Sequence, residues 1–305
     1  MLTLIMIFMI EPINTENSDN FHRIEDLVIF QNFIYTSDRD TGQIHQLNLN
    51  GDHVRSFAGQ GQGPGENEQT SALVGYKDQL FALDKKGSKI SVYSLTGEYL
   101  KQVRLAQISG SLDLTGRKLV ASPVNLEGVF SSIDPDKGEV KTFSLQNLED
   151  WSRPSPSSRY ASLWRGIEAT ATPTGNLVIG MIFLDQVAEV TTEGDLVSAW
   201  DGSGFLPIHE TAVNGERLPK YFSGITYEVG PEGGIWFAAS EEGKTGASPI
   251  LFKLNMATQR IEKRKNFKEH IRLIRYSLPD KKWALVLENQ SIQVFTETEW
   301  KKNLE

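Results

Sequence analysis

Short apolar segments recur along the whole chain, separated by polar loops that carry turn residues. Six segments fit one template, in which a turn signal precedes an alternating or fully apolar run rich in Val, Ile, Tyr and Phe. These segments are 33–38, 79–84, 118–123, 176–181, 234–239 and 282–287. A second apolar segment follows each of them and begins at Ile44, Ile90, Phe130, Val187, Leu251 or Ile292. Helical periodicity is weak throughout, so the pattern predicts an all-β protein.

The unit repeats about every 40 to 60 residues, a period typical of stacked β units. A single four-stranded sheet cannot bury both of its faces, whereas a closed ring gives every sheet two neighbours. We therefore expect a single domain over residues 1–305, folded as a six-bladed β-propeller of four-stranded antiparallel blades. The innermost strands are expected near 23–28, 72–76, 111–114, 167–171, 225–229 and 271–276.

The last unit lacks a fourth strand, because only a charged tail, 297–305, follows its second apolar segment. The apolar segment Ile5–Ile10 is expected to close the last blade, with residues 1–20 as closing strand and lead-in. The alternative is a leader remnant, since Leu2 to Ile10 has the length of a signal-peptide core. This segment lacks a basic n-region and a small-residue cleavage site, and it is far shorter than the roughly 20 residues that span a bilayer.

Composition excludes several classes of function. Hydrophobic residues make up 39% of the chain and charged residues 23%, as in ordinary globular proteins. The formal net charge is −8, so we expect no nucleic-acid partner, and neither the charge nor the length of any apolar run favours membrane insertion. The chain has no cysteine, which excludes disulfides and thiolate metal sites.

The first unit carries a recognisable sequence, FIYTSDRDTGQIHQLNLNGDHVRSFAGQGQGPGE, and the second, LFALDKKGSKISVYSLTGEYL, is similar to it. An aromatic-rich strand ending in Asp, followed by a GxGPGE turn, resembles the bacterial six-bladed β-propeller family related to NHL-repeat proteins. This resemblance implies the propeller fold and an exported protein, secreted or periplasmic. It implies no activity, because most members have none assigned.

The Gly-rich turn has a structural interpretation. Gly61, Gly63 and Gly65 permit positive φ, Pro64 keeps its neighbour extended, and Glu66 can accept N–H bonds from the turn. A phosphate-binding loop would need a following helix N-terminus and usually a Lys, whereas this loop leads into a strand. We interpret the turn as a device that fixes the register of the repeat.

The channel of the ring is the first candidate site. The expected innermost strands carry Arg23, Glu25, Asp113, Glu168, Tyr227, Glu228, Arg272 and Arg275. Mixed charge in a narrow channel forms either a metal or substrate site or a set of ion pairs with water. Ion pairs are the favoured interpretation, because a fold alone implies no function.

Two long inter-blade loops, 146–165 and 201–222, form the second candidate site. The candidate ligand-binding residues in them are Arg159, Tyr160, Trp164, Arg165, His209, Arg217, Lys220 and Tyr221. Aromatic rings next to Arg side chains are typical of recognition surfaces. The alternative is that the aromatic residues fold back and plug the wider end of the ring.

We expect a monomeric, non-enzymatic binding or scaffold module that presents these loops to a peptide, glycan or protein, without a cofactor. No catalytic residue is indicated, because no Ser lies in a nucleophile-elbow sequence.

One alternative resembles the gluconolactonase-type propellers, which are metal-dependent hydrolases or lactonases. Here Glu25, Asp113, Glu168 and Glu228 would bind calcium, although the inner strands lack Asn and three Arg residues oppose a cation. Another resembles the zinc-dependent, peptide-amidating lyases. The histidines available are His22, His45, His53, His209 and His270, and they lack the spacing of a three-histidine site.

Overall fold

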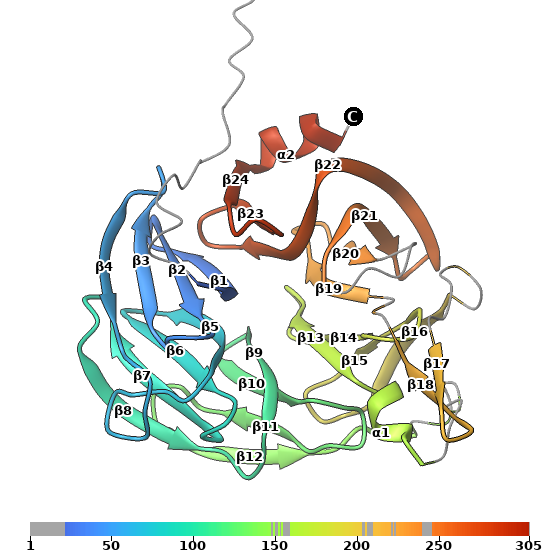
Figure 1. The fold of residues 1–305 in the computed structure, drawn as a ribbon, viewed down its shortest axis with the longest axis horizontal. Coiled ribbons are helices and arrows are strands. Elements are labelled where there is room, and N and C mark those ends of the chain that lie inside the picture. Colours follow the sequence, from blue (N-terminus) through green and yellow to red (C-terminus); the bar gives the residue numbers. More distant parts are fainter. Residues whose placement is uncertain are drawn as a thin grey trace, which may run out of the picture.

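Antiparallel strands make up almost the whole of the computed structural model and surround a central axis as six blades (Figure 1). The structure describes residues 22–147, 149, 152, 154, 159–202, 205, 210–220, 222, 224–239 and 246–304. One inner strand from each blade contacts the inner strands of both neighbours, so the six form a closed ring. The prediction of an all-β, six-bladed propeller is confirmed.

Blades 1 to 4 are meanders in which each strand pairs antiparallel with the next one in the chain. Blade 1 contains β1 (Ile24–Phe30), β2 (Phe33–Asp38), β3 (Ile44–Asn48) and β4 (His53–Phe57). Blade 2 contains β5 (Thr70–Tyr76), β6 (Gln79–Asp84), β7 (Lys89–Ser94) and β8 (Tyr99–Arg104). Blade 3 contains β9 (Ser109–Thr115), β10 (Lys118–Pro123), β11 (Phe130–Ile133) and β12 (Val140–Phe143). Blade 4 contains β13 (Ile167–Ala171), β14 (Leu177–Met181), β15 (Gln186–Val190) and β16 (Leu196–Asp201).

Blades 5 and 6 share one strand. Blade 5 contains β19 (Gly224–Val229), β20 (Ile235–Ala239) and β21 (Ser248–Asn255), and blade 6 contains β23 (Lys282–Leu287) and β24 (Ile292–Thr296). Between them runs β22 (Arg260–Ser277), whose first part pairs with β21 and whose last part pairs with β23. Figure 1 shows β22 curving from the rim of the ring to its centre. The strand predicted to close blade 6, Ile5–Ile10, lies outside the described residues.

The buried side chains form six clusters, each between two neighbouring blades. Between blades 4 and 5, the ring of Tyr227 lies so close to Gly180 that a Cβ there would be 2.4 Å from a ring carbon. The Tyr227 hydroxyl donates to the carbonyl oxygen of Met181 at 2.7 Å. Each blade therefore depends on both neighbours for the burial of its faces.

The Gly-rich turn between β4 and β5 folds onto itself. The carboxylate of Glu66 accepts the Gly63 N–H at 2.8 Å, as the sequence predicted, and Gly65 adopts a positive φ of 76°. Asn67, which follows Glu66, is fully buried, and its side-chain amide donates to the Tyr93 hydroxyl at 3.2 Å. The turn is thus a structural part of blade 2.

Two buried aspartates at the ends of β2 and β6 explain the Asp of the repeat sequence. Asp38 accepts the backbone N–H of His22, which precedes β1, at 2.7 Å. Asp84 accepts the N–H groups of Glu68 and Gln69, which precede β5, both at 3.0 Å, and that of Gly87 at 3.1 Å. Each carboxylate therefore anchors the entry to the inner strand of its own blade.

The two long loops contain short elements that the sequence did not predict. Helix α1 (Ala161–Trp164) lies in the first, and the hairpin β17 (Glu210–Val213) with β18 (Glu216–Pro219) lies in the second. The helix contacts β18, so the two insertions pack against each other.

The C-terminal residues also differ from the prediction of a charged tail, because they form helix α2 (Glu297–Leu304). Trp300 of this helix is 3% exposed, and its ring stacks on that of Trp283 with centroids 4.6 Å apart. One buried aromatic side chain thus orders an otherwise polar segment. Neither described helix has the length and apolar character needed to cross a membrane.

Candidate functional site

A cavity of about 790 Å³ occupies the centre of the ring, and the inner strands of all six blades line it. The structure places all the charged residues that the sequence assigned to the channel on its wall: Arg23, Glu25, Asp113, Glu168, Glu228, Arg272 and Arg275. Asp26 lies on the same wall. Charged side chains from the inner strands of blades 1, 3, 4, 5 and 6 therefore converge on this cavity.

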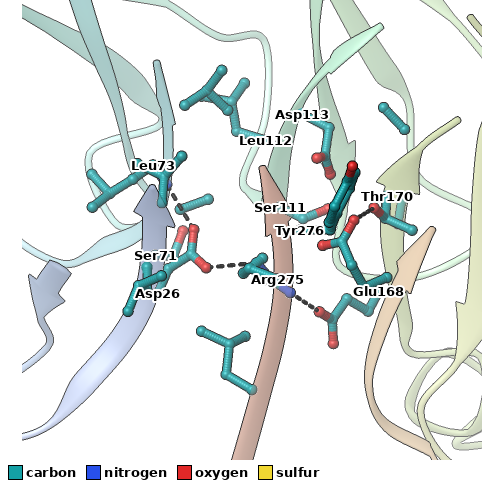
Figure 2. Close-up of a pocket in the computed structure, with 18 of the residues that line it drawn as sticks. Asp26, Ser71, Leu73, Ser111, Leu112, Asp113, Glu168, Thr170, Arg275 and Tyr276 are labelled. Atoms are coloured by element: carbon teal, nitrogen blue, oxygen red, sulfur yellow. Dashed lines mark hydrogen bonds and ion pairs between the residues drawn. The ribbon is translucent and has the colours of Figure 1, made fainter. Parts of the chain in front are cut away.

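Five of these side chains form what we call the central belt: Asp26, Asp113, Glu168, Glu228 and Arg275. Arg275 lies between Asp26 and Glu168 (Figure 2), donating from Nε to Asp26 Oδ1 at 2.9 Å and from Nη1 to Glu168 Oε1 at 3.4 Å. Asp26 also accepts the N–H of Leu73 on β5 at 2.8 Å. The belt thus links blades 1, 2, 4 and 6 across the axis.

Three carboxyl groups of the belt retain protons more strongly than usual. Burial raises the pKa of Asp113 to about 8 and that of Glu168 to about 7, and the positive charge of Arg275 offsets part of each rise. Burial also raises the pKa of Glu228 well above its ordinary value. Burial of these three groups beside a single guanidinium thus lets the belt hold protons close to neutral pH.

Asp26 could not be found from the alternation of β1. In a regular strand, neighbouring residues face opposite sides, so only one of Glu25 and Asp26 would reach the channel. A β-bulge between Ile24 and Asp26 breaks this alternation, and both residues lie on the wall.

The two ends of the cavity differ. The inner strands begin, and the second strands of the blades end, at the same face of the ring, which we call the entry face. Among the described residues, the wall there carries the cations Arg23, Arg39, Lys85 and Arg272, the carboxylate Glu25, and the apolar side chains Val124, Ile182 and Phe222. The opposite end carries Phe30, Leu114, Pro173, Tyr276, Leu278 and Pro279.

Arg272 shows how much positive charge gathers at the entry face. Burial lowers the pKa of Arg272, and the charges of Arg23 and Arg39 lower it further, whereas the carboxylates Glu25 and Glu288 raise it. Its Nη1 donates at 2.9 Å to Gln290 Oε1, which is neutral. The cations at this face are therefore only partly neutralised.

The candidate residues of the first long loop have separate roles. Trp164 has no exposed surface, packs in the cluster between blades 3 and 4, and donates its indole N–H to the Arg217 carbonyl at 2.9 Å. This position fits the alternative in which aromatic residues fold back. Arg165 pairs with Glu127 at 3.0 Å. Arg159 is exposed, with its guanidinium carbon 5.5 Å from the centre of the Tyr160 ring.

The candidates of the second loop do not form a described site. Arg217 pairs with Glu210 within its own hairpin, and Lys220 is exposed. His209 and Tyr221 lie outside the described residues. Phe222, which the sequence placed in this loop but not among the binding residues, stacks on Phe183 at 5.1 Å and lines the cavity.

The described residues do not fit a divalent metal in the cavity. A guanidinium occupies the space between Asp26 and Glu168, and no group of three or more described His, Cys, Asp or Glu side chains is arranged to hold an ion. No described histidine lines the cavity. His270 pairs with Glu288 at 3.2 Å, and His45 and His53 lie on the outer strands of blade 1.

Comparisons with known proteins support the fold. A family model described as a 6-bladed beta-propeller matches residues 5–120, which confirms the resemblance seen in the first two units. A comparison with curated proteins finds no match.

Several solved structures are similar to this chain in fold. A structural genomics protein of unknown function from Bacteroides thetaiotaomicron has a TM-score of 0.61 at 12% identity, with 90% of this chain and 70% of that chain covered. A streptogramin B lyase has a TM-score of 0.56 at 14% identity, with 88% and 77% covered. The RRP9 WD40 repeats have a TM-score of 0.59 at 10% identity, with 89% and 79% covered. At these identities the similarity shows the fold alone.

Proposed function

Because the chain folds as a six-bladed propeller around an open, charged cavity, we propose that it is a non-enzymatic binding protein whose ligand enters that cavity from the entry face. The observation that carries this proposal is the cavity itself, about 790 Å³ and lined by all six blades. Pockets for small molecules commonly measure about 300 to 1,000 Å³. The ligand is accordingly a small molecule or the end of a peptide.

The long loops support this proposal as part of the rim. Phe222 belongs to the second loop and lines the cavity beside Ile182. Trp164 fixes the first loop to the body of the ring through the core between blades 3 and 4. The loops thus shape the entrance, while the inner strands supply most of the wall.

Binding is favoured over catalysis because the belt side chains are held by one another. Arg275 engages two carboxylates, and the hydroxyl of Thr170 donates to Glu228 at 3.3 Å. One observation favours a second candidate function, hydrolysis by carboxyl groups: the pKa values of Asp113 and Glu168, about 8 and about 7, suit general acid–base work near neutral pH.

A ligand screen on the full chain tests the proposal. Ligand-observed NMR with a defined library of small carboxylates, alcohols and amines should give hits that bind the protein and lose binding to Ser111→Trp. Ser111 lines the cavity beside the belt (Figure 2), so an indole there would fill the space. Thr211→Trp, on the exposed hairpin strand β17, is the matched control and should bind the hits unchanged.

The same screen separates the two candidate functions. Hits that persist equally in Ser111→Trp, or a complete lack of hits, would contradict binding in the cavity. A hit that is consumed during the measurement, and is no longer consumed in Asp113→Asn with Glu168→Gln, would replace the binding function by the hydrolytic one.

A further inference from the structure

The entry face of the cavity is cationic in a protein that is acidic as a whole. The chain has a formal net charge of −8. Yet the described residues that line this end of the cavity include four cations, Arg23, Arg39, Lys85 and Arg272, and one carboxylate, Glu25. A local charge opposite to that of the whole molecule concentrates ligands of the complementary sign at the entrance.

The contacts of Arg39 and Arg272 within the protein leave much of their positive charge without a close carboxylate. The contact between Arg39 and Glu25 is long, at 4.0 Å, and the Arg39 side chain remains 40% exposed. Arg272 donates to the neutral amide oxygen of Gln290. Guanidinium groups present planar sets of donors that match the two oxygens of a carboxylate.

The opposite side of the same entrance is apolar. Ile182 follows β14 and Phe222 precedes β19, and both line the cavity, as does Val124 after β10. The ring of Phe222 stacks on Phe183, which fixes its orientation. Blades 1, 2 and 6 therefore supply the charged side of the entrance, and the connections of blades 3 to 5 supply the apolar side.

We propose that this entrance recognises an amphipathic carboxylate: its carboxylate binds the cations led by Arg23 and Arg272, and its apolar group covers Ile182 and Phe222. The inference rests on the proposed function, because it assumes that a ligand enters the cavity. A singly charged anion fits better than a phosphate dianion, since the carboxylate Glu25 lies among the cations of the entrance and opposes added negative charge.

The test is calorimetric titration of the full chain with four probes that share a phenyl group: phenylbutyrate, phenylbutanol, phenylbutylamine and phenyl phosphate. Phenylbutyrate should bind about ten-fold more tightly than the alcohol, the gain expected of one good ionic contact. Raising the salt to about 1 M should remove most of this gain, because the screening length falls to about 3 Å.

Variants locate the contact. Arg272→Gln and Arg23→Gln should each weaken phenylbutyrate about ten-fold and leave phenylbutanol unchanged. Arg55→Gln, on the exposed strand β4, is the matched control and should change neither. Thermal unfolding of each variant shows whether it folds, and Arg272→Lys, which keeps the charge, should recover part of the affinity if removal of the guanidinium alone is too disruptive.

The outcomes separate this inference from the proposed function. Equal binding of acid and alcohol, or tighter binding of the amine or the phosphate, would overturn the inference and leave the cavity as a binding site. Binding of phenylbutyrate that survives both Arg→Gln variants would also overturn it. If no probe binds the wild-type chain, the inference is wrong, while the proposed function still depends on the screen with Ser111→Trp.

Discussion

The two sides of the ring are built differently. Blades 1 and 2 have buried aspartates that anchor the entry to their inner strands, and the connection between them is a turn folded on itself. In blades 3 and 4 the second strand ends in Pro123 and Met181, where blades 1 and 2 have Asp. A long connection with inserted elements follows the last strand of each of these two blades. The regular side, together with Arg272 of blade 6, supplies the cations of the cavity entrance, and the irregular side, together with the connection into blade 5, supplies its apolar surface. An entrance with two chemical faces thus arises from repeats that have diverged.

The largest effect should come from the irregular side. Trp164→Ala should lower the free energy of unfolding by about 3–5 kcal/mol, because it removes a fully buried indole from the core between blades 3 and 4. Leu163→Ala on the same helix is the control, since Leu163 is 51% exposed and should matter little. Urea unfolding measures both. Equal, small losses would mean that the insertion is not part of the fold.

On the regular side, the largest loss of stability should come from replacing a buried aspartate. Asp84→Ala should cost about 3 kcal/mol, because three backbone N–H groups lose their acceptor and the buried Lys89, 3.9 Å away, loses a counter-charge. Asp78→Ala, at an exposed turn of the same blade, serves as the comparison. Thermal unfolding that is the same for both variants would refute the anchoring role.

The belt, where the two sides meet, should give the protein an unusual pH dependence. The folded state raises the pKa of Asp113 to about 8 and of Glu168 to about 7, so it binds more protons than the unfolded chain between about pH 4 and about pH 8. The stability is therefore greatest at the acidic end of this window and falls as the pH rises.

At about 1.4 kcal/mol per pKa unit, the two full shifts would give a fall of about 7 kcal/mol between about pH 5 and about pH 9. Hydration of the carboxyl groups in the open cavity reduces this several-fold, and we expect a fall of about 2 kcal/mol. The double variant Asp113→Asn with Glu168→Gln should make the profile measured by urea unfolding less steep, while Glu228 retains its raised pKa. An equally steep profile in the variant would place the protons elsewhere.

The smallest effect should come from the surface contact between the two sides. Lys77, in the turn after β5, pairs with Asp136 of blade 3 at 2.7 Å, and both side chains are more than half exposed. Exposed ion pairs contribute little, because solvent screens them. Lys77→Ala should leave the unfolding midpoint unchanged. A clear loss would show that the border between the sides depends on charge.

The repeat was readable from sequence because blade strands are short, apolar and bounded by turns. Every second and third strand was predicted, and the inner strands followed from them. The glycine-rich turn was also interpretable, since Glu66 has one obvious set of donors, those of its own turn.

The residues of the site were harder to predict from the sequence. Asp26 depends on a β-bulge, and the burial of Trp164 depends on contacts with a hairpin residue 53 positions away. Helix α2 depends on Trp300 reaching Trp283. Each is a tertiary effect, and periodicity reports only the local preference of the chain.

Strand β22 has a consequence for the dynamics of the ring. Its 18 residues form the outermost strand of blade 5 at one end and the innermost strand of blade 6 at the other, without an intervening loop. Local opening of a protein proceeds in cooperative units, and a strand that pairs with both blades couples the opening of one to that of the other. Amides of blades 5 and 6 should therefore exchange with deuterium as a single block, while the loops between the other blades allow each of those to open on its own.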